Sequence, residues 1–516
     1  MNPIALGLFA SRLAAVCDEM GAVLRRAAFS PNIKDRLDFS CAIFGPGGAL
    51  CAQAAHIPVH LGSMAYAMTG IVERLEWRPG DMVIVNDPYL GGTHLPDVTV
   101  IAPLFSGGAP VGFAANRAHH ADIGAAAPGS MPVSRRLEEE GVIIPPGYLL
   151  RDGEWQAPLL EAILERNSNP AQGRGDFAAQ VAANLRGLHR LEALVGEMGR
   201  DAYFAALAAL NDYAECLAVG ALRDIPDGVY RFADVMDDDG AGSTDLAITA
   251  TVTAAAGRIL VDFAGTAPQV EGNINCPISV TAAAVYYVFR CLMPPDTPDC
   301  AGSFRPIGLA APAGCLLNAV RPAAVAAGNV ETSTRVVDVV LGALAQALPD
   351  RIPAASHGSM NNVAMGARGN AVWDYYETLG GGMGAGPNGG GLSAVQTHMT
   401  NTRNTPVESL ELHFPLRMRR YEIRRGSDGG GRRQGGDGLR REFEFLVPTE
   451  VSLLTERRRH RPWGLAGGGD GAVGENRFGD QRLPPKLSLH AAPGERLLIE
   501  TPGGGGWGRA DVENPE

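Results

Sequence analysis

The feature that most constrains the fold is a pair of apolar segments, residues 98–105 and 111–115, separated by a glycine turn. Both segments are rich in apolar and β-branched residues, which favours β-strands, and the sequence Ser-Gly-Gly-Ala-Pro between them is typical of a tight turn. The sequence therefore predicts a β-hairpin that reverses at Gly107 and Gly108. In such a hairpin Asp97 lies opposite Ala118 or His119.

Two clusters of metal-ligand residue types flank this hairpin. His94 and Asp97 precede it, and His119, His120 and Asp122 follow it. Imidazole and carboxylate ligands together suit a divalent ion such as zinc, manganese or iron, and they leave positions open for water or substrate. A water on such an ion is available as hydroxide near neutral pH, because its pKa falls from about 16 to about 7 in the best cases. We expect a metal site made by His94, Asp97 and one of the two adjacent histidines, with Asp122 as a further candidate.

The hairpin does not fix which of the two histidines faces the metal. Consecutive strand residues point to opposite sides of a sheet, and a shift of one residue in register exchanges them. His119 and His120 therefore remain alternatives at this point.

Composition narrows the functional classes. A net charge of −12 argues against a nucleic-acid surface, and no basic helix suggests an anionic membrane. Residues 1–30 lack the pattern of an export signal, and no apolar run approaches the roughly 18 residues of a membrane span. Eight cysteines without a Cys-x-x-Cys pair fit reduced thiols. We expect a cytoplasmic protein whose partners are proteins and small molecules.

The 516 residues are enough for two to four domains. Helical periodicity covers residues 6–28, 60–77 and 175–222, and strands are expected at 36–44, at 81–86 and just before Ala54. The pattern changes to alternating strands after the sequence Ile-Pro-Asp-Gly at 225–228. We therefore expect a multi-domain chain of mixed α/β and α+β class. Residues 1–225 form the catalytic, metal-binding region, and residues 226–516 form a mixed α/β region whose Gly-rich loops contact substrate and partner.

Three polar segments of the second half are candidates for substrate binding. Residues 271–277 and 327–333 each precede an apolar helix, where free backbone N–H groups bind anions. Helix capping is the alternative explanation for their polar side chains. The glycine run at 380–391 could wrap around a substrate, or it could be a tight structural loop. The substrate-binding candidates are Asn273, Asn275, Asn329, Glu331, Gly382 and Gly384.

Other catalytic motifs are weak or missing. The glycine run lacks the Gly-Lys-Ser/Thr ending of a phosphate-binding loop, and the chain has no Gly-x-Ser-x-Gly motif of a serine hydrolase. Cys276 would need a histidine base near it to act as a nucleophile, so a buried structural cysteine is the simpler interpretation. Residues 417–441, with Arg432 and Arg433, predict a solvated hairpin, with a partner interface as the alternative.

Several long motifs resemble the hydantoinase B/oxoprolinase family over almost the whole chain. Besides the two metal clusters, they are residues 30–40, 56–64, 128–132 and the closing Thr-Pro-Gly-Gly-Gly-Gly-Trp-Gly at 501–508. The resemblance implies the B component of an ATP-dependent amidohydrolase that opens a hydantoin, 5-oxoproline or a lactam. In that scheme a separate hydantoinase A/oxoprolinase-type ATPase subunit phosphorylates the amide oxygen, and this chain supplies a metal-bound water without binding ATP through a motif of its own.

The same resemblance implies a set of site residues. It maps the ligands of a divalent ion, with zinc or manganese expected, onto Asp38, His94, Asp97 and His119. His120 then becomes a catalytic group beside the ligands, able to orient a ligand or relay a proton, and Asp122 is expected to hydrogen-bond one of the histidines. The sequence departs from the family pattern at 125–126 and at 147–148, which bears on the substrate more than on the metal.

Two other functions are compatible with the resemblance. The superfamily includes the large subunits of acetone and acetophenone carboxylases, which join bicarbonate to an enolate with an ATP-consuming partner. A non-catalytic scaffold that stabilises the ATPase component is a third hypothesis, and intact metal ligands argue against it.

Overall fold

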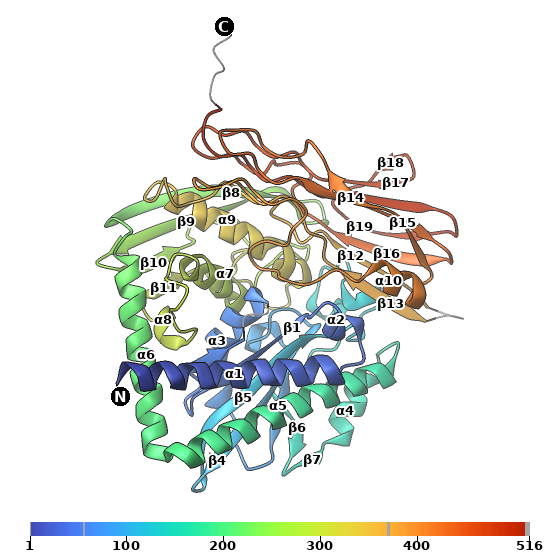
Figure 1. Ribbon diagram of the computed structural model, residues 1–516. Helices are drawn as coiled ribbons and strands as arrows, with labels where there is room; N and C mark the ends of the chain where they lie inside the picture. The colour runs from blue at the N-terminus through green and yellow to red at the C-terminus, as the bar shows by residue number, and fades with distance from the viewer. Residues whose placement is uncertain (1, 55–56, 369–371, 511–516) are drawn as a thin grey trace.

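Figure 1 shows the computed structural model, which describes residues 2–54, 57–368 and 372–510. His56, part of one motif named above, lies outside these residues. The described residues form four sheets with helices packed on them. The mixed α/β class with several sheets is the one expected from the sequence.

A seven-stranded antiparallel sheet forms the lower half of the molecule in Figure 1, in the order β2-β1-β5-β4-β3-β6-β7. The predicted hairpin is its centre. In the hairpin Asp97 pairs with His119, and the chain reverses at Gly107 and Gly108, whose φ angles of 60° and 78° favour glycine. The strands are β1 (Phe39–Phe44), β2 (Leu50–Gln53), β3 (Met82–Val85), β4 (Asp97–Ser106), β5 (Ala109–His119), β6 (Gly147–Arg151) and β7 (Glu154–Trp155).

Helices cover both faces of this sheet, because alternate strand residues are apolar on each side. On one face Cys41 and Ile43 of β1 pack with α1 (Pro3–Ala27) and α5 (Pro170–Met198). On the other face Ala42 and Phe44 pack with α3 (Pro58–Val72). The short helices α2 (Pro31–Lys34) and α4 (Ala157–Leu164) complete this region.

The helix predicted at 60–77 ends earlier than expected, at Val72. The indole Nε1 of Trp77 donates a hydrogen bond to the Val72 carbonyl, 3.1 Å away, and so satisfies a carbonyl at the helix end. The tryptophan that looked like part of the helix instead folds back on its last turn.

The long helix α6 (Arg200–Leu222) leads from the lower sheet to the second half of the chain (Figure 1). Within the described residues it is the one helix whose length and composition would allow it to cross a membrane. Its apolar side, which includes Tyr203, Leu210 and Ala214, is buried against the core of the lower half. We therefore interpret α6 as a core helix.

A second sheet, in the order β11-β10-β9-β8, packs on α7 (Ile278–Arg290) and α9 (Ser333–Leu344) around the largest apolar core. Its strands are β8 (Gly228–Asp238), β9 (Thr244–Ala255), β10 (Arg258–Asp262) and β11 (Ile307–Ala310), and α8 (Ala301–Phe304) precedes the last of them. Just before α9, residues Gly328–Thr332 form one turn of π-helix, a geometry that recurs at functional sites. This turn contains Asn329 and Glu331.

Two further sheets pack face to face at the top of Figure 1 and enclose another apolar core. Helix α10 (Val407–His413) lies at their edge. The first sheet has the order β13-β12-β16-β19 and the second β14-β15-β20-β17-β18. Their strands are β12 (Asn362–Ala367), β13 (Trp373–Glu377), β14 (Leu416–Arg424), β15 (Gly438–Phe445), β16 (Thr449–Leu454), β17 (Glu475–Phe478), β18 (Gln481–Arg482), β19 (Lys486–Ala491) and β20 (Arg496–Glu500).

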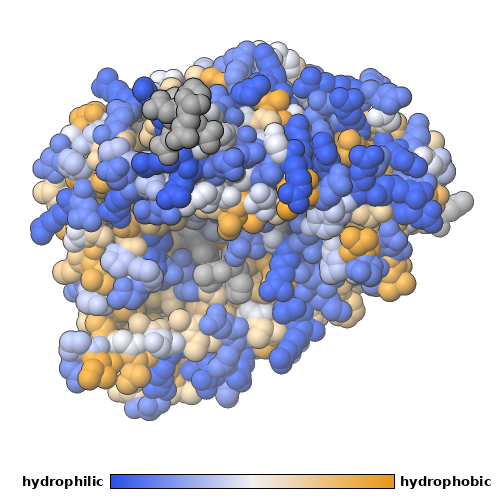
Figure 2. Space-filling view, turned by 45° about the horizontal axis from the view of Figure 1, so that its top comes forward, coloured by the Kyte–Doolittle hydropathy of each residue, from blue (hydrophilic) through white to orange (hydrophobic). Residues whose placement is uncertain are grey.

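The halves of the chain meet closely. Gly62 of α3 lies where an added Cβ would come within 2.5 Å of the Ala283 Cα of α7, so these two helices touch through their backbones. Arg36 donates hydrogen bonds to the Tyr376 carbonyl and to Thr378. The face in Figure 2 is largely hydrophilic and is hollowed across its middle.

Candidate metal centre

His94, Asp97 and His119 form a compact buried group at the open end of the β4–β5 hairpin. Asp97 begins β4, His119 ends β5, and His94 lies in the loop just before Asp97. Their ligand atoms all lie within 4.8 Å of one another. His94 Nε2 and His119 Nδ1 are each 3.1 Å from Asp97 Oδ1, and none of the three side chains is more than 3% exposed. This set of residues could hold a metal ion.

The hydrogen bonds of the two histidines leave a metal-binding nitrogen free on each. His94 Nδ1 lies 3.3 Å from the Ala326 carbonyl, and His119 Nδ1 faces Asp97. Protons on the Nδ1 atoms would leave lone pairs on the Nε2 atoms, and both Nε2 atoms are buried without a hydrogen-bond partner among the described residues. Unpartnered imidazole nitrogens beside a carboxylate fit a divalent cation.

A cavity of ≈ 20 Å³ adjoins these atoms, which is room for about one water molecule or one ion. Asp38 lines the cavity but lies outside the compact group, and its carboxylate is 3.6 Å from the Arg36 guanidinium. The donor types, the free nitrogens and the size of the cavity therefore all fit a single divalent ion.

Electrostatics also favour a cation at this point. Burial acts to raise the pKa of Asp97, but His94 and His60 hold it well below its usual range. Burial acts to lower the pKa of His94, but the negative charge of Asp97 raises it above the ordinary value. Burial lowers the pKa of His119, which keeps that ring neutral and able to bind a metal. Asp97 is thus a fixed negative charge in the site.

Three neighbours of the group were not predicted as site residues. The Nε2 atom of His60, from the start of α3, is 3.1 Å from Asp97 Oδ2, and Thr93 donates a 2.6 Å hydrogen bond to the same oxygen. Tyr376 stacks on His119, with ring centres 4.7 Å apart. His60 and Tyr376 reach the site through tertiary packing and give no spacing signal in the sequence, whereas Thr93, four residues before Asp97, could have been found locally.

His120 and Asp122 lie outside the compact group. His120 faces away from His119, with Nε2 at 3.0 Å from Gln180 Oε1 and its ring against Phe177. Among the described residues the hydrogen bonds of Asp122 come from Gly124, Ser130 and Ser168. The prediction that Asp122 accepts a hydrogen bond from a histidine is therefore wrong, because backbone N–H groups and the Ser130 hydroxyl donate to its carboxylate.

Of the six candidate substrate-binding residues, Asn329 lines the ≈ 20 Å³ cavity beside His94, Asp97 and His119, which is called the metal cavity below. Its amide Nδ2 is 3.5 Å from Asp97 Oδ2, and its Oδ1 is buried without a partner among the described residues. The Asn275 amide instead donates to three loop carbonyls, and Asn273 donates to the Pro132 carbonyl. Glu331 accepts hydrogen bonds from the Met360 N–H and from Asn362. These bonds hold loops in place around the site.

The two glycines lie inside the interlocked glycine segments of the second half. An added Cβ would come within 2.0 Å of the Gly436 carbonyl oxygen at Gly382 and within 1.9 Å of the Ala354 carbonyl oxygen at Gly384. Close packing of backbone against backbone accounts for glycine at both positions. Cys276 is also buried, and its thiol donates a hydrogen bond to the Gly328 carbonyl, in agreement with a structural cysteine.

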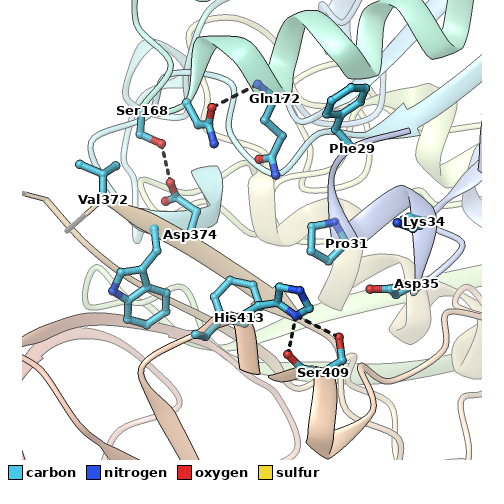
Figure 3. Close-up of a pocket in the computed structure, with 13 residues that line it drawn as sticks. Phe29, Pro31, Lys34, Asp35, Ser168, Gln172, Val372, Asp374, Ser409 and His413 are labelled. Atoms are coloured by element: carbon cyan, nitrogen blue, oxygen red, sulfur yellow. Dashed lines mark hydrogen bonds between the residues drawn. The ribbon is translucent and has the colours of Figure 1, made fainter. Parts of the chain in front are cut away.

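A separate pocket of ≈ 370 Å³ lies where the region of α2 and α5 meets β13 and α10 (Figure 3). Its polar side chains are largely paired with each other or with backbone: Ser168 donates to Asp374, and His413 bonds the Ser409 carbonyl. None of the residues that line it lines the metal cavity. We assign it no part in the chemistry.

Comparison with known proteins identifies relatives along the whole chain. The sequence model described as hydantoinase B/oxoprolinase matches residues 2–510. A 5-oxoprolinase of Dictyostelium discoideum is 38% identical over 526 residues, which cover 99% of this chain and 41% of that protein. A putative B-type subunit of a D-/L-hydantoinase from Pseudomonas sp. is 32% identical, over 100% of this chain and 91% of that protein. The chain thus spans about two fifths of that 5-oxoprolinase and most of the hydantoinase subunit.

Solved structures share the fold. The ATP-dependent caprolactamase of Pseudomonas jessenii matches with a TM-score of 0.93 and 28% identity, covering 99% of this chain and 92% of that one. A nucleotide-free acetone carboxylase matches with a TM-score of 0.87 and 17% identity, covering 98% of this chain and 76% of that one, a likeness that shows the fold alone.

Proposed function

Because the chain belongs to the hydantoinase B/oxoprolinase family, we propose that it is the hydrolytic B component of an ATP-dependent amidohydrolase that opens a cyclic amide. A hydantoin, 5-oxoproline or a lactam is the expected substrate class. The observation that carries the proposal is the buried group of His94, Asp97 and His119, with two free imidazole nitrogens beside a carboxylate.

We propose that His94, Asp97 and His119, with Asp38 as a fourth ligand, hold zinc or manganese. When bound, such an ion lowers the pKa of a coordinated water and polarises a carbonyl oxygen. Thr93 fixes the Oδ2 atom of Asp97 and thereby directs Oδ1 toward the two histidines. Asn329 presents an unpartnered amide oxygen beside the cavity, where it can accept a hydrogen bond from a water or from a substrate N–H.

His120 and Asp122 act, in this proposal, by positioning the site. His120 holds Gln180, which in turn donates to the Val98 carbonyl next to Asp97. Asp122 orders the turn that follows β5 through its bonds to Gly124 and Ser130. Neither side chain needs to touch the reacting atoms for this role.

We propose that the activating half of the reaction belongs to a hydantoinase A/oxoprolinase-type ATPase subunit. The chain has no Gly-Lys-Ser/Thr phosphate-binding motif, and the relative that is named as one subunit of a hydantoinase matches nearly end to end. We also propose a cytoplasmic location, in keeping with eight cysteines that are all free thiols in the structure.

Reconstitution tests the proposal. The chain is co-purified with its A component, and ATP consumption is measured with a panel of hydantoins, 5-oxoproline, lactams, and ketones with bicarbonate. We expect one class of cyclic amide to stimulate ATP consumption with release of the ring-opened product. Stimulation by a ketone with bicarbonate alone would instead identify a carboxylase, the alternative raised by the shared fold.

A further inference from the structure

A third cavity, larger than the metal cavity and adjoining it, has no role in the function proposed so far. We infer that this cavity, of ≈ 520 Å³, holds the organic ring of the substrate and selects cyclic amides that are neutral and apolar. The inference rests on the proposed function and specifies its substrate class.

The two cavities share a wall. Thr400 lines both of them, and its neighbours divide between them: His398 lines the larger cavity and Met399 the metal cavity. The start of α3 is divided in the same way, with Pro58 on the larger cavity and Val59 on the smaller one. The larger cavity therefore adjoins the metal cavity along this wall, with Thr400 exposed to both.

The metal cavity is too small to hold a whole substrate, so the substrate ring needs a second cavity beside it. Its ≈ 20 Å³ suffices for about one water or one ion, so the ring of a hydantoin or lactam does not fit inside it. A substrate can reach the ligands only with its carbonyl group while its ring remains outside. The larger cavity has the volume for a ring and a substituent, within the range usual for small-molecule sites.

The walls of this cavity are mainly apolar. Tyr287 and Val288 come from the end of α7, and Leu292 follows that helix. Leu341 comes from α9, and Ile352 and Met383 complete the surface. Burial of a benzyl or alkyl substituent here would remove apolar surface from water and so favour binding.

Two polar atoms in the wall match a cyclic amide. Gln396 donates its amide N–H to the Thr378 carbonyl, and its Oε1 is buried without a partner among the described residues. His398 Nε2 is also buried and unpartnered there, since the nearest carboxylate oxygen, on Asp338, is 3.7 Å away. An amide N–H can donate to Gln396, and a ring carbonyl or second N–H can pair with His398.

The charges in the wall argue against an anionic ligand. Of the described residues that line the cavity, Arg351 is the single lysine or arginine, and its guanidinium bonds Asp224 and the Leu292 carbonyl. Burial lowers the pKa of His398, which keeps that ring neutral near pH 7. A carboxylate such as that of 5-oxoproline would thus lose its hydration without gaining an unpaired cation.

Cys291 lines the cavity and is exposed, so it reports occupancy directly. In the full chain with Cys216→Ala, which removes the other exposed thiol, the rate of alkylation by N-ethylmaleimide is measured with and without ligand. We expect saturating 5-benzylhydantoin to slow the reaction at least fivefold and 5-oxoproline at the same concentration to leave it unchanged. Equal protection by both compounds, or protection by neither, would overturn the inference.

A second variant tests the same cavity in the complex with the ATPase component. Cys291→Trp places an indole at the cavity wall, and we expect kcat/KM for 5-benzylhydantoin to fall at least tenfold with unchanged metal content. Cys216→Trp, on the exposed side of α6, is the matched control and should retain full activity. Full activity of Cys291→Trp would contradict the inference. Protection of Cys291 without any amide-dependent ATP consumption would support the cavity assignment and refute the proposed function.

Discussion

The two oxygens of Asp97 have different tasks. Oδ2 accepts from Thr93 and contacts His60, whereas Oδ1 faces His94 and His119. Because one oxygen is fixed by protein groups, the other keeps a constant direction toward the cavity. Such support of a ligand by its neighbours usually changes metal affinity by 10- to 100-fold.

Loss of a ligand should therefore lower metal content and activity together. We expect His94→Ala or Asp97→Ala to reduce bound metal at least tenfold with little change in the circular dichroism spectrum, because the cavity group contributes little apolar packing. Elemental analysis of the purified variants measures the first effect. His120→Ala is the matched variant, and it should keep its metal and mainly slow turnover.

Variants of the two adjacent histidines test which of them binds the metal. Full metal occupancy in His119→Ala together with an empty His120→Ala protein would show that the two roles are exchanged. Full occupancy in both variants would show that the hairpin does not bind the metal.

Glu140 should make stability depend on pH. Burial raises its pKa from 4.5 to about 7, and its Oε1 accepts the N–H groups of Val325 and Ala326. A carboxyl group with a raised pKa in the folded state stabilises the fold at low pH, and this contribution is lost as pH rises from about 4.5 through about 7. The loss is at most about 3 to 4 kcal/mol, from 1.4 kcal/mol per pKa unit.

Glu140→Gln keeps the acceptor oxygen and removes the titration. We expect the difference in thermal midpoint between this variant and the natural protein to grow in favour of the variant between pH 5 and pH 8. A constant difference over that range would show that Glu140 does not titrate there.

At the scale of elements, four glycine segments interlock at 380–391, 429–438, 464–471 and 503–508. Their backbones bond each other directly, as in the hydrogen bonds from the Ala385 N–H to the Gly505 carbonyl and from the Gly504 N–H to the Gly436 carbonyl. At Gly504 an added Cβ would come within 2.1 Å of the Met383 carbonyl oxygen, whereas at Gly430 nothing lies within 4 Å. The segments thus form a layer in which most positions exclude any side chain.

A matched pair of alanine variants tests this layer. We expect Gly504→Ala to destabilise the protein by about 3 kcal/mol, because backbone atoms cannot move aside as a flexible side chain can. Gly430→Ala should change stability by less than about 0.5 kcal/mol. Denaturant unfolding followed by tryptophan fluorescence compares the two, and equal effects would contradict the packing explanation.

The elements that the sequence predicted best are those with local signals. The β4–β5 hairpin follows from its apolar alternation and the Gly107–Gly108 turn, and its register brings Asp97 opposite His119. Residues whose partners lie far along the chain were not predictable. His60 contacts Asp97, which lies 37 residues away in the sequence. The Asn275 amide donates hydrogen bonds to loop carbonyls up to 49 residues away. A polar side chain before a helix has the same sequence pattern whether it binds a ligand or a neighbouring loop.

At the scale of the molecule, the candidate metal centre draws on both halves of the chain. Every strand of the seven-stranded sheet precedes residue 156 and every strand of the other sheets follows residue 227, and the division near residue 225 stays a prediction. Asn329 and Tyr376 nevertheless reach the centre from the second half. We therefore treat 1–225 and 226–516 as two regions that complete one site together.

The purified chain alone should neither hydrolyse ATP nor open a cyclic amide at a useful rate. The chain carries no phosphate-binding motif, and the metal cavity has room for about one small group. The chain can therefore supply the water that attacks the amide but cannot phosphorylate the amide first.

Phosphate release is measured for the metal-loaded chain with and without cyclic amide, and then after addition of the A component. We expect background rates until the A component is added and stimulation by substrate afterwards. Robust ATP turnover by the purified chain without the A component would end the division of labour proposed here.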